Sequence, residues 1–114
     1  MMFDKYCIDK IQKGEKTITR RLPSKSGRRS AVPGTIHKLK VDRTEKTFGS
    51  ILINSCSLTL VKDIDDKEAI KEGFNNRKEY IDYFMDINNI DMLSDYDMIW
   101  RVRFTYLGDD LNDS

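Results

Sequence analysis

The stretch 14-GEKTITRR-21 places a predicted strand inside the most cationic part of the chain. Four of its eight residues are charged, yet Thr17, Ile18 and Thr19 favour β-strands and half-buried positions. In an extended strand, Thr19 and Arg21 share one face and Ile18 lies on the other. If Ile18 faces the core, we expect Thr19 and Arg21 to point into a groove or into solvent.

Lys16 lies where this strand meets a preceding helix. Gly14 is placed to end that helix, which is predicted by apolar residues at helical spacing: Phe3, Cys7, Ile8 and Ile11. A turn at this junction would bring the Lys16 ammonium toward Thr19. An amine, a hydroxyl and the guanidinium of Arg21 would then converge on one spot.

The remaining elements follow from apolar periodicity and from turn residues. After a loop over residues 23–30, we expect strands over 36–41 and 48–64, helices over 66–72 and from 77 onward, and a strand over 98–108. Asn54-Ser55 is the expected bend of the long strand. Capping-box patterns mark both of the later helix starts: Asp65 with Glu68, and Asn76 with Glu79.

This order of elements predicts an α+β fold, with residues 1–108 as a single domain and 109–114 as a frayed C-terminal tail. Cys7 and Cys56 form no CxxC pair, and one histidine beside two scattered cysteines argues against a zinc site. The chain shows no signal peptide and no long apolar span. We therefore expect a cytoplasmic protein with no cofactor, no metal, no membrane association and no obligate protein partner.

The net charge of +1 hides an asymmetry between two parts of the chain. Residues 13–40 contain nine Lys or Arg against one acid, whereas residues 63–114 contain fourteen acids against six bases. The basic segment suggests an anionic or polar partner, of which RNA is the commonest kind. Lys25, Arg28 and Arg29 in the loop are the expected RNA or phosphate contacts. Two solvated faces of opposite charge are the alternative.

The chain resembles the ASCH domain, a PUA-like mixed β-barrel with flanking helices. The resemblance rests on 14-GEKTITRR-21 after its helix, and on weaker features across nearly the whole chain: Pro33-Gly34, 69-AIKEGF-74, the helix with Tyr80 and Phe84, and the last strand around Trp100. The first motif is similar to that of the small N4-acetylcytidine amidohydrolases, Gly-x-Lys-Thr-x-Thr-x-Arg. Many other ASCH chains carry Glu where this chain has Thr19.

This resemblance implies a catalytic trio of Lys16, Thr19 and Glu72, with Arg21 and Arg20 binding the substrate, a modified nucleoside. Thr19 would attack the amide carbonyl and Lys16 would take its proton. Glu72 would orient Lys16 and relay a proton to the leaving amine. Arg21 or a backbone N–H near the Gly14 turn would stabilise the oxyanion. Independently, an acid in the last turn of a helix faces the negative end of the dipole, which a nearby lysine would offset.

Three alternatives stay open at this level. Lys16 and Glu72 could activate water directly, with Thr19 only a hydrogen-bond donor. The chain could be an RNA-binding module in which the basic segment follows phosphates without chemistry. It could also be an ASCH ribonuclease in which Lys16, Arg21 and Glu72 act on a phosphodiester.

Overall fold

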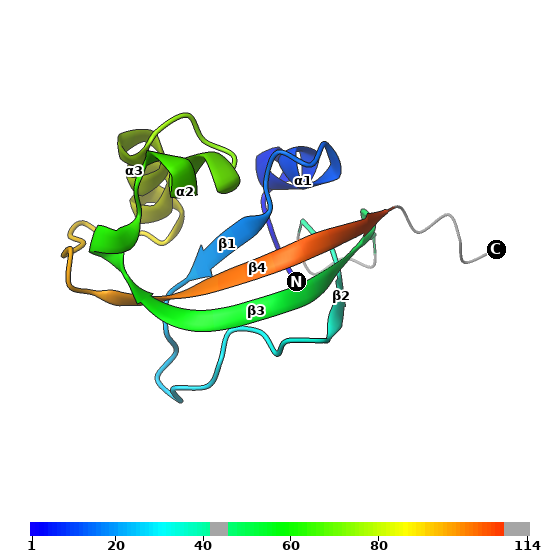
Figure 1. Ribbon diagram of the computed structural model, residues 1–114, viewed down its shortest axis with the longest axis horizontal. Helices are drawn as coiled ribbons and strands as arrows, with labels where there is room; N and C mark the ends of the chain where they lie inside the picture. Colours follow the sequence, from blue (N-terminus) through cyan, green and yellow to red (C-terminus); the bar gives the residue numbers. More distant parts are fainter. Residues whose placement is uncertain (42–45, 109–114) are drawn as a thin grey trace.

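The computed structural model describes residues 1–41 and 46–108, which fold into three α-helices and four strands (Figure 1). In chain order the elements are α1 (Lys5–Gln12), β1 (Ile18–Arg21), β2 (Ile36–Lys38), β3 (Ser50–Leu60), the 3-10 helix η1 (Val61–Asp63), α2 (Asp66–Lys71), α3 (Arg77–Ile87) and β4 (Met98–Gly108). The tail predicted over 109–114 lies outside the described residues. Within those residues, no helix has the length and apolarity needed to cross a bilayer.

The four strands form one antiparallel sheet in the order β1-β4-β3-β2. The long central strands β3 and β4 pair from Ser50 opposite Gly108 to Leu60 opposite Met98. The α+β class is therefore confirmed, but the strands do not close into the expected mixed barrel. Across the described ranges the sheet stays open, because β2 spans three residues and pairs only with β3. In the part of the chain that the structure describes, Met2 and Lys40 form an isolated parallel bridge outside the four strands.

The bend predicted in the long strand is confirmed. The register of β3 against β4 shifts between Ile53 and Ser55, which leaves Asn54 as the extra residue of a bulge. The Asn54 side chain donates to Thr105 Oγ1 at 2.8 Å. A bulge bends its strand, and β3 is visibly curved (Figure 1).

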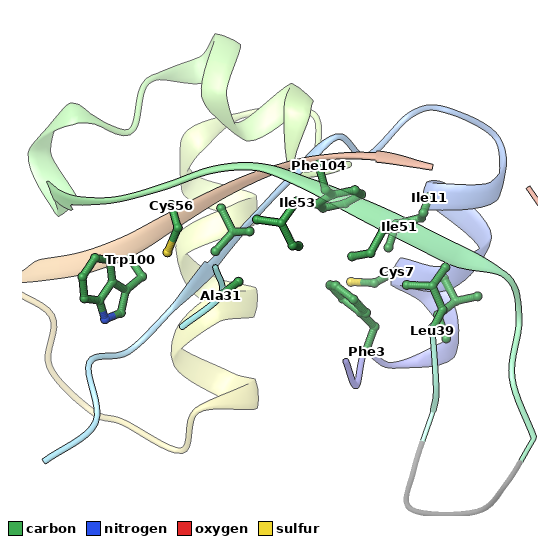
Figure 2. Packing of buried hydrophobic residues seen from close by; sticks show 12 residues of the cluster. Phe3, Cys7, Ile11, Ala31, Leu39, Ile51, Ile53, Cys56, Trp100 and Phe104 are labelled. Atoms are coloured by element: carbon green, nitrogen blue, oxygen red, sulfur yellow. The ribbon is translucent and has the colours of Figure 1, made fainter. Parts of the chain in front are cut away.

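Two apolar clusters hold the helices to the sheet. The first joins α1 to β3 and β4 and includes Phe3, Ile11, Ile51, Ile53, Trp100 and Phe104 (Figure 2). The second joins α2 and α3 to the start of β4 and includes Ile64, Ala69, Tyr80, Phe84 and Ile99. Because successive strand residues point to opposite faces, β4 contributes Ile99 to one cluster and Trp100 to the other.

Both predicted helix starts are confirmed, but each capping box is only half formed. Asp65 accepts from Glu68 N at 2.8 Å, and Asn76 accepts from Glu79 N at 2.9 Å. The glutamate carboxylates bond elsewhere. Glu79 accepts from the Asn75 side chain at 3.2 Å, whereas Glu68 reaches back to the sheet.

Candidate active site

The segment between α1 and β1 is held by the C-terminal ends of two helices. After α1 ends, Gly14 takes a φ of 77°, and Lys16 N donates to Lys10 O at 3.2 Å. Thr17 N then donates to Lys71 O, at the end of α2, at 2.8 Å. These bonds use carbonyl groups that a helix end leaves unpaired, so they fix where β1 begins.

Lys16, Arg20 and Glu72 form a buried cluster of charges. Lys16 Nζ donates to Glu72 Oε1 at 2.6 Å, and Arg20 Nη1 donates to Glu72 Oε2 at 2.9 Å. The ammonium also donates to Ile18 O at 2.9 Å and to Glu72 O at 3.1 Å, so each of its three protons has an acceptor. All three side chains are at most 2% exposed. Charges buried this deeply require such pairing.

The C-terminal end of α2 fixes the position of Glu72. It is the C-cap residue of that helix, and Gly73 after it takes a φ of 95°, a conformation that residues with a Cβ avoid. The Lys16 ammonium therefore meets both the carboxylate of Glu72 and its backbone carbonyl. This contact places a cation at the negative end of the α2 dipole.

A pocket of about 290 Å³ opens beside this cluster. Its walls come from the N-terminal segment, α1, β1, the end of α2 and α3: Met2, Phe3, Asp4, Cys7, Lys16, Thr19, Arg20, Arg21, Glu72, Tyr80, Tyr83, Phe84, Ile87 and Asn88. The structure thus brings all five residues expected in the catalytic and substrate site to one pocket. Its volume is near the lower end of the range for small-molecule sites, about 300–1,000 Å³.

Thr19 reaches the pocket from the face of β1 that the alternation predicts. Its partner across the strand pair is Val102, and residues directly opposite each other share a face of the sheet. Thr19 is 6% exposed, and among the described residues its hydroxyl has no hydrogen-bond partner. A hydroxyl of this kind is available to a ligand in the pocket.

Arg21 lies on the same face of β1 as Thr19. Its Nη2 donates to Met2 O at 2.8 Å, and its guanidinium lies 4.9 Å from the centre of the Phe3 ring. Burial is the largest influence on this group and lowers the pKa of Arg21. An arginine nevertheless stays protonated in proteins, so Arg21 brings a positive charge and further N–H donors to the pocket.

Arg20 also lines the pocket, but it is committed to the acids of α2. One terminal nitrogen bonds Glu72, and the other, Nη2, donates to Glu68 Oε1 at 2.6 Å. Its Nε is buried with no partner in the part of the chain that the structure describes. The geometry therefore favours Arg21 over Arg20 as the residue that contacts a substrate.

A second polar wall of the pocket was not expected from the sequence. Asp4 caps α1 by accepting from Cys7 N at 2.8 Å, and its other oxygen accepts from the Tyr83 hydroxyl. The Cys7 thiol lies 3.1 Å from that hydroxyl. Asp4 three residues ahead of Cys7 was readable as a helix cap, but nothing in the sequence pointed to Tyr83 of α3 as its partner.

The side chains of this second wall, Asp4, Cys7 and Tyr83, differ in charge at neutral pH. Burial raises the pKa of the Cys7 thiol, and burial together with the bond to Asp4 raises the pKa of Tyr83. Although burial opposes it, the bonds from Tyr83 and Cys7 lower the pKa of Asp4. Asp4 is therefore anionic, whereas Cys7 is a neutral thiol and a poor nucleophile.

The basic loop lies apart from this pocket. Lys25, Arg28 and Arg29 are exposed, and none of them lines it. Within residues 1–41 and 46–108 no ion pair involves these three side chains. Their role as phosphate contacts stays a prediction. In the same ranges, no group of three or more His, Cys, Asp or Glu could hold a metal ion.

Comparison with solved structures identifies the fold. The crystal structure of an ASCH domain from Lactobacillus crispatus matches with a TM-score of 0.69 and 19% identity, over 95% of this chain and 77% of that chain. A protein from Enterococcus faecalis assigned to DUF984 matches with a TM-score of 0.67 and 11% identity, over 95% of this chain and 73% of that chain. No family model and no curated protein matches the sequence. The chain therefore has the ASCH-domain fold.

Proposed function

We propose that this protein with the ASCH-domain fold is an amidohydrolase that removes the acyl group from N4-acetylcytidine or a related N4-acylcytosine. The observation that carries the proposal is the Thr19 hydroxyl, which has no partner among the described residues and lines the same pocket as the buried Lys16 amine. A hydroxyl that lines the same pocket as an amine can attack an amide if the amine takes its proton. The motif resemblance supplies the substrate class, and a pocket of about 290 Å³ suits a base or nucleoside.

In the first step, Thr19 Oγ1 bonds to the amide carbonyl carbon while its proton passes to Lys16 Nζ. Lys16 acts in its neutral form, which has two N–H donors and a lone pair. The two shorter bonds, to Glu72 Oε1 at 2.6 Å and to Ile18 O at 2.9 Å, can then persist. The longer bond to Glu72 O, at 3.1 Å, is the one released.

In the second step the tetrahedral intermediate collapses. The guanidinium of Arg21 stabilises the oxyanion, the C–N bond breaks, and Lys16 returns the proton to the leaving exocyclic amine of cytosine. Water then attacks the carbonyl carbon of the ester on Thr19 while Lys16 takes its proton. The bond from this carbon to Thr19 Oγ1 breaks, Lys16 returns the proton to Thr19 Oγ1, and the carboxylic acid product leaves and ionises. Both oxygens of Glu72 are bonded, so in this mechanism Glu72 orients Lys16 and does not relay the proton.

RNA binding is the second candidate function. It is favoured by one specific observation, the three exposed cations Lys25, Arg28 and Arg29 outside the pocket. Such a loop suits contacts with phosphates, which position an RNA without any chemistry. The two functions are compatible if the substrate cytosine is part of an RNA.

The test pairs Thr19→Ala with Thr17→Ala, a matched change in the same stretch at an exposed residue that does not line the pocket. Each protein is incubated with N4-acetylcytidine and, in parallel, with short RNA, and cytidine or cleavage is followed by chromatography. We expect Thr19→Ala to lower kcat by at least about 10³-fold and Thr17→Ala to stay within a few-fold of wild type. A folded Thr19→Ala variant that keeps near wild-type turnover would make water the nucleophile. Wild-type protein that binds RNA and yields no cytidine would favour the binding function.

A further inference from the structure

The carboxylate of Glu68 lies between two arginines that face each other across the sheet. Arg20 of β1 is directly opposite Arg101 of β4, a position in which like charges repel. Glu68 Oε1 accepts from Arg20 Nη2 and from Arg101 Nε, both at 2.6 Å, and Oε2 accepts from Arg101 Nη2 at 3.3 Å. One carboxylate thus joins both guanidinium groups.

The same bonds continue into the pocket. Arg20 uses its second terminal nitrogen for Glu72 Oε2, and Glu72 Oε1 accepts from Lys16. Along this path the side-chain exposure falls from 22% at Arg101 and 16% at Glu68 to 1% at Arg20. A continuous chain of charged hydrogen bonds therefore leads from the protein surface to the amine beside the pocket.

We propose that Glu68 is a positioning residue of the active site, which fixes the Arg20 guanidinium and, through Glu72, the amine of Lys16. A planar guanidinium is oriented by two acceptors on its fork, and Glu68 supplies one of the two. Without that carboxylate the only remaining partner of Arg20 is Glu72, since Arg20 Nε has none among the described residues. Arg20 and Glu72 could then shift together, and Lys16 would shift with them. The catalytic consequence rests on the proposed function, whereas the positioning does not.

The bonds of the Glu68 carboxylate to Arg20 and Arg101 differ from those of an ordinary capping-box glutamate. Glu68 is the third residue after the cap Asp65, where a capping-box glutamate turns back to the cap backbone. Glu68 instead turns its carboxylate toward β1 and β4. Glu79 occupies the same position in α3, and within the described residues its carboxylate accepts hydrogen bonds only from the Asn75 side chain. Glu79 is therefore a matched control.

The experiment compares Glu68→Gln with Glu79→Gln by two measurements. With N4-acetylcytidine, we expect Glu68→Gln to lower kcat by up to about 10²-fold while KM changes little, because misplacing a catalytic group by about 1 Å has that effect. Glu79→Gln should match wild type in both constants. A Glu68→Gln variant with wild-type kcat and KM would overturn the catalytic part.

The second measurement needs no substrate and separates this proposal from the proposed function. The three acceptors of Lys16 should make its ammonium visible as a 1H–15N NMR signal. We expect this signal to shift or vanish in Glu68→Gln and to stay in place in Glu79→Gln. An unchanged signal would overturn the positioning even if the enzyme is active, and a changed signal supports it even if no deacylation is found. If Glu68→Gln does not fold, Glu68→Asp serves in its place, because the shorter side chain withdraws the carboxylate from Arg20 Nη2 and keeps the charge. An unchanged Lys16 signal in that variant overturns the positioning, and a changed signal supports it.

Discussion

Two cationic segments lie close together in this chain, but they differ in burial and in ion pairing. Residues 16–21 and residues 25–29 each carry three Lys or Arg side chains. In the first segment Lys16 and Arg20 are buried and bonded to carboxylates. In the second segment all three cations are exposed, and none forms an ion pair in the ranges that the structure describes. Similar composition therefore gives a buried polar site in one case and a solvated loop in the other.

The difference comes from the acids of α2. Glu68 and Glu72 belong to the acidic part of the chain, yet they pair with Arg20 and Lys16 of the basic part. The charge asymmetry is thus not a simple division into two solvated faces, because part of the basic segment has the protein's own acids as its partner. Lys16 and Arg20 need these carboxylate partners because an unpaired buried charge is strongly destabilising.

The largest expected effect is on catalysis in the buried segment. Lys16→Arg keeps the positive charge but cannot give up a proton, so kcat for N4-acetylcytidine should fall by about 10²–10⁴-fold, the contribution of a general base. Lys25→Arg, the same change in the loop, should leave kcat within a few-fold. Steady-state kinetics measures both, with circular dichroism to check the fold. An active Lys16→Arg enzyme would mean that position 16 supplies only charge, and RNA binding would become the leading function.

The next effect is on stability. Glu72→Ala leaves Lys16 and Arg20 buried without their shared carboxylate, and we expect the free energy of unfolding in urea to fall by about 3–5 kcal/mol. Replacing Lys25, Arg28 and Arg29 together by Ala should change it by no more than about 0.5 kcal/mol per site. The contrast between the segments would fail if the two variants were equally stable.

Acid should lower the stability that Glu68 provides through its bonds to Arg20 and Arg101. Burial alone would raise the pKa of Glu68, but hydrogen bonds from Arg101 and Arg20 hold it down to about 2, from an ordinary value of 4.5. A carboxylate with a depressed pKa gives stability that is complete above its unfolded value and is lost as pH falls toward its folded value. Among the described residues, the charged groups that form ion pairs with Glu68 are Arg20, Arg101 and Lys71, and all three are cations that favour the ionised carboxylate.

We therefore expect the wild-type protein to lose on the order of 3 kcal/mol of unfolding free energy through Glu68 between about pH 5 and pH 2. Urea unfolding at a series of pH values measures this loss. Glu68→Gln, which has no carboxyl to titrate there, should lose less over the same interval. Parallel curves for the two proteins would contradict the assignment of this ionisation to Glu68.

The smallest effect concerns the loop and appears only with RNA. Replacing Lys25, Arg28 and Arg29 by Ala should weaken RNA binding and lower the dependence of log K on log salt by about 2, at about 0.7 for each phosphate contact with a single strand. Turnover of the free nucleoside should stay within a few-fold. Fluorescence anisotropy over a range of salt concentrations measures the first quantity. An equal loss on nucleoside and RNA would show that the loop shapes the pocket itself.

Local sequence determined where the elements begin and end. Gly14 ends α1, Asp65 and Asn76 start α2 and α3, and Asn54 marks the bulge of β3, all as predicted. These features depend on contacts between residues close in the chain, so a single sequence contains the necessary information. The strands expected over 36–41 and 48–64 were exceptions. Regular pairing of β2 ends at Lys38, which leaves it at an open edge of the sheet, and β3 ends at Leu60, where the 3-10 helix η1 (Val61–Asp63) begins.

Which polar side chains bond to one another depends on the tertiary structure. Alternation placed Thr19 and Arg21 on one face of β1, and the family resemblance pointed to Glu72. Neither indicated that Glu68, 48 residues from Arg20, would bond to both Arg20 and Arg101. Nor did either indicate that Tyr83, 79 residues from Asp4, would bond to Asp4 in the second wall of the pocket. The physical reason is that periodicity reports the face on which a side chain lies but not the distant residue that packing brings against it.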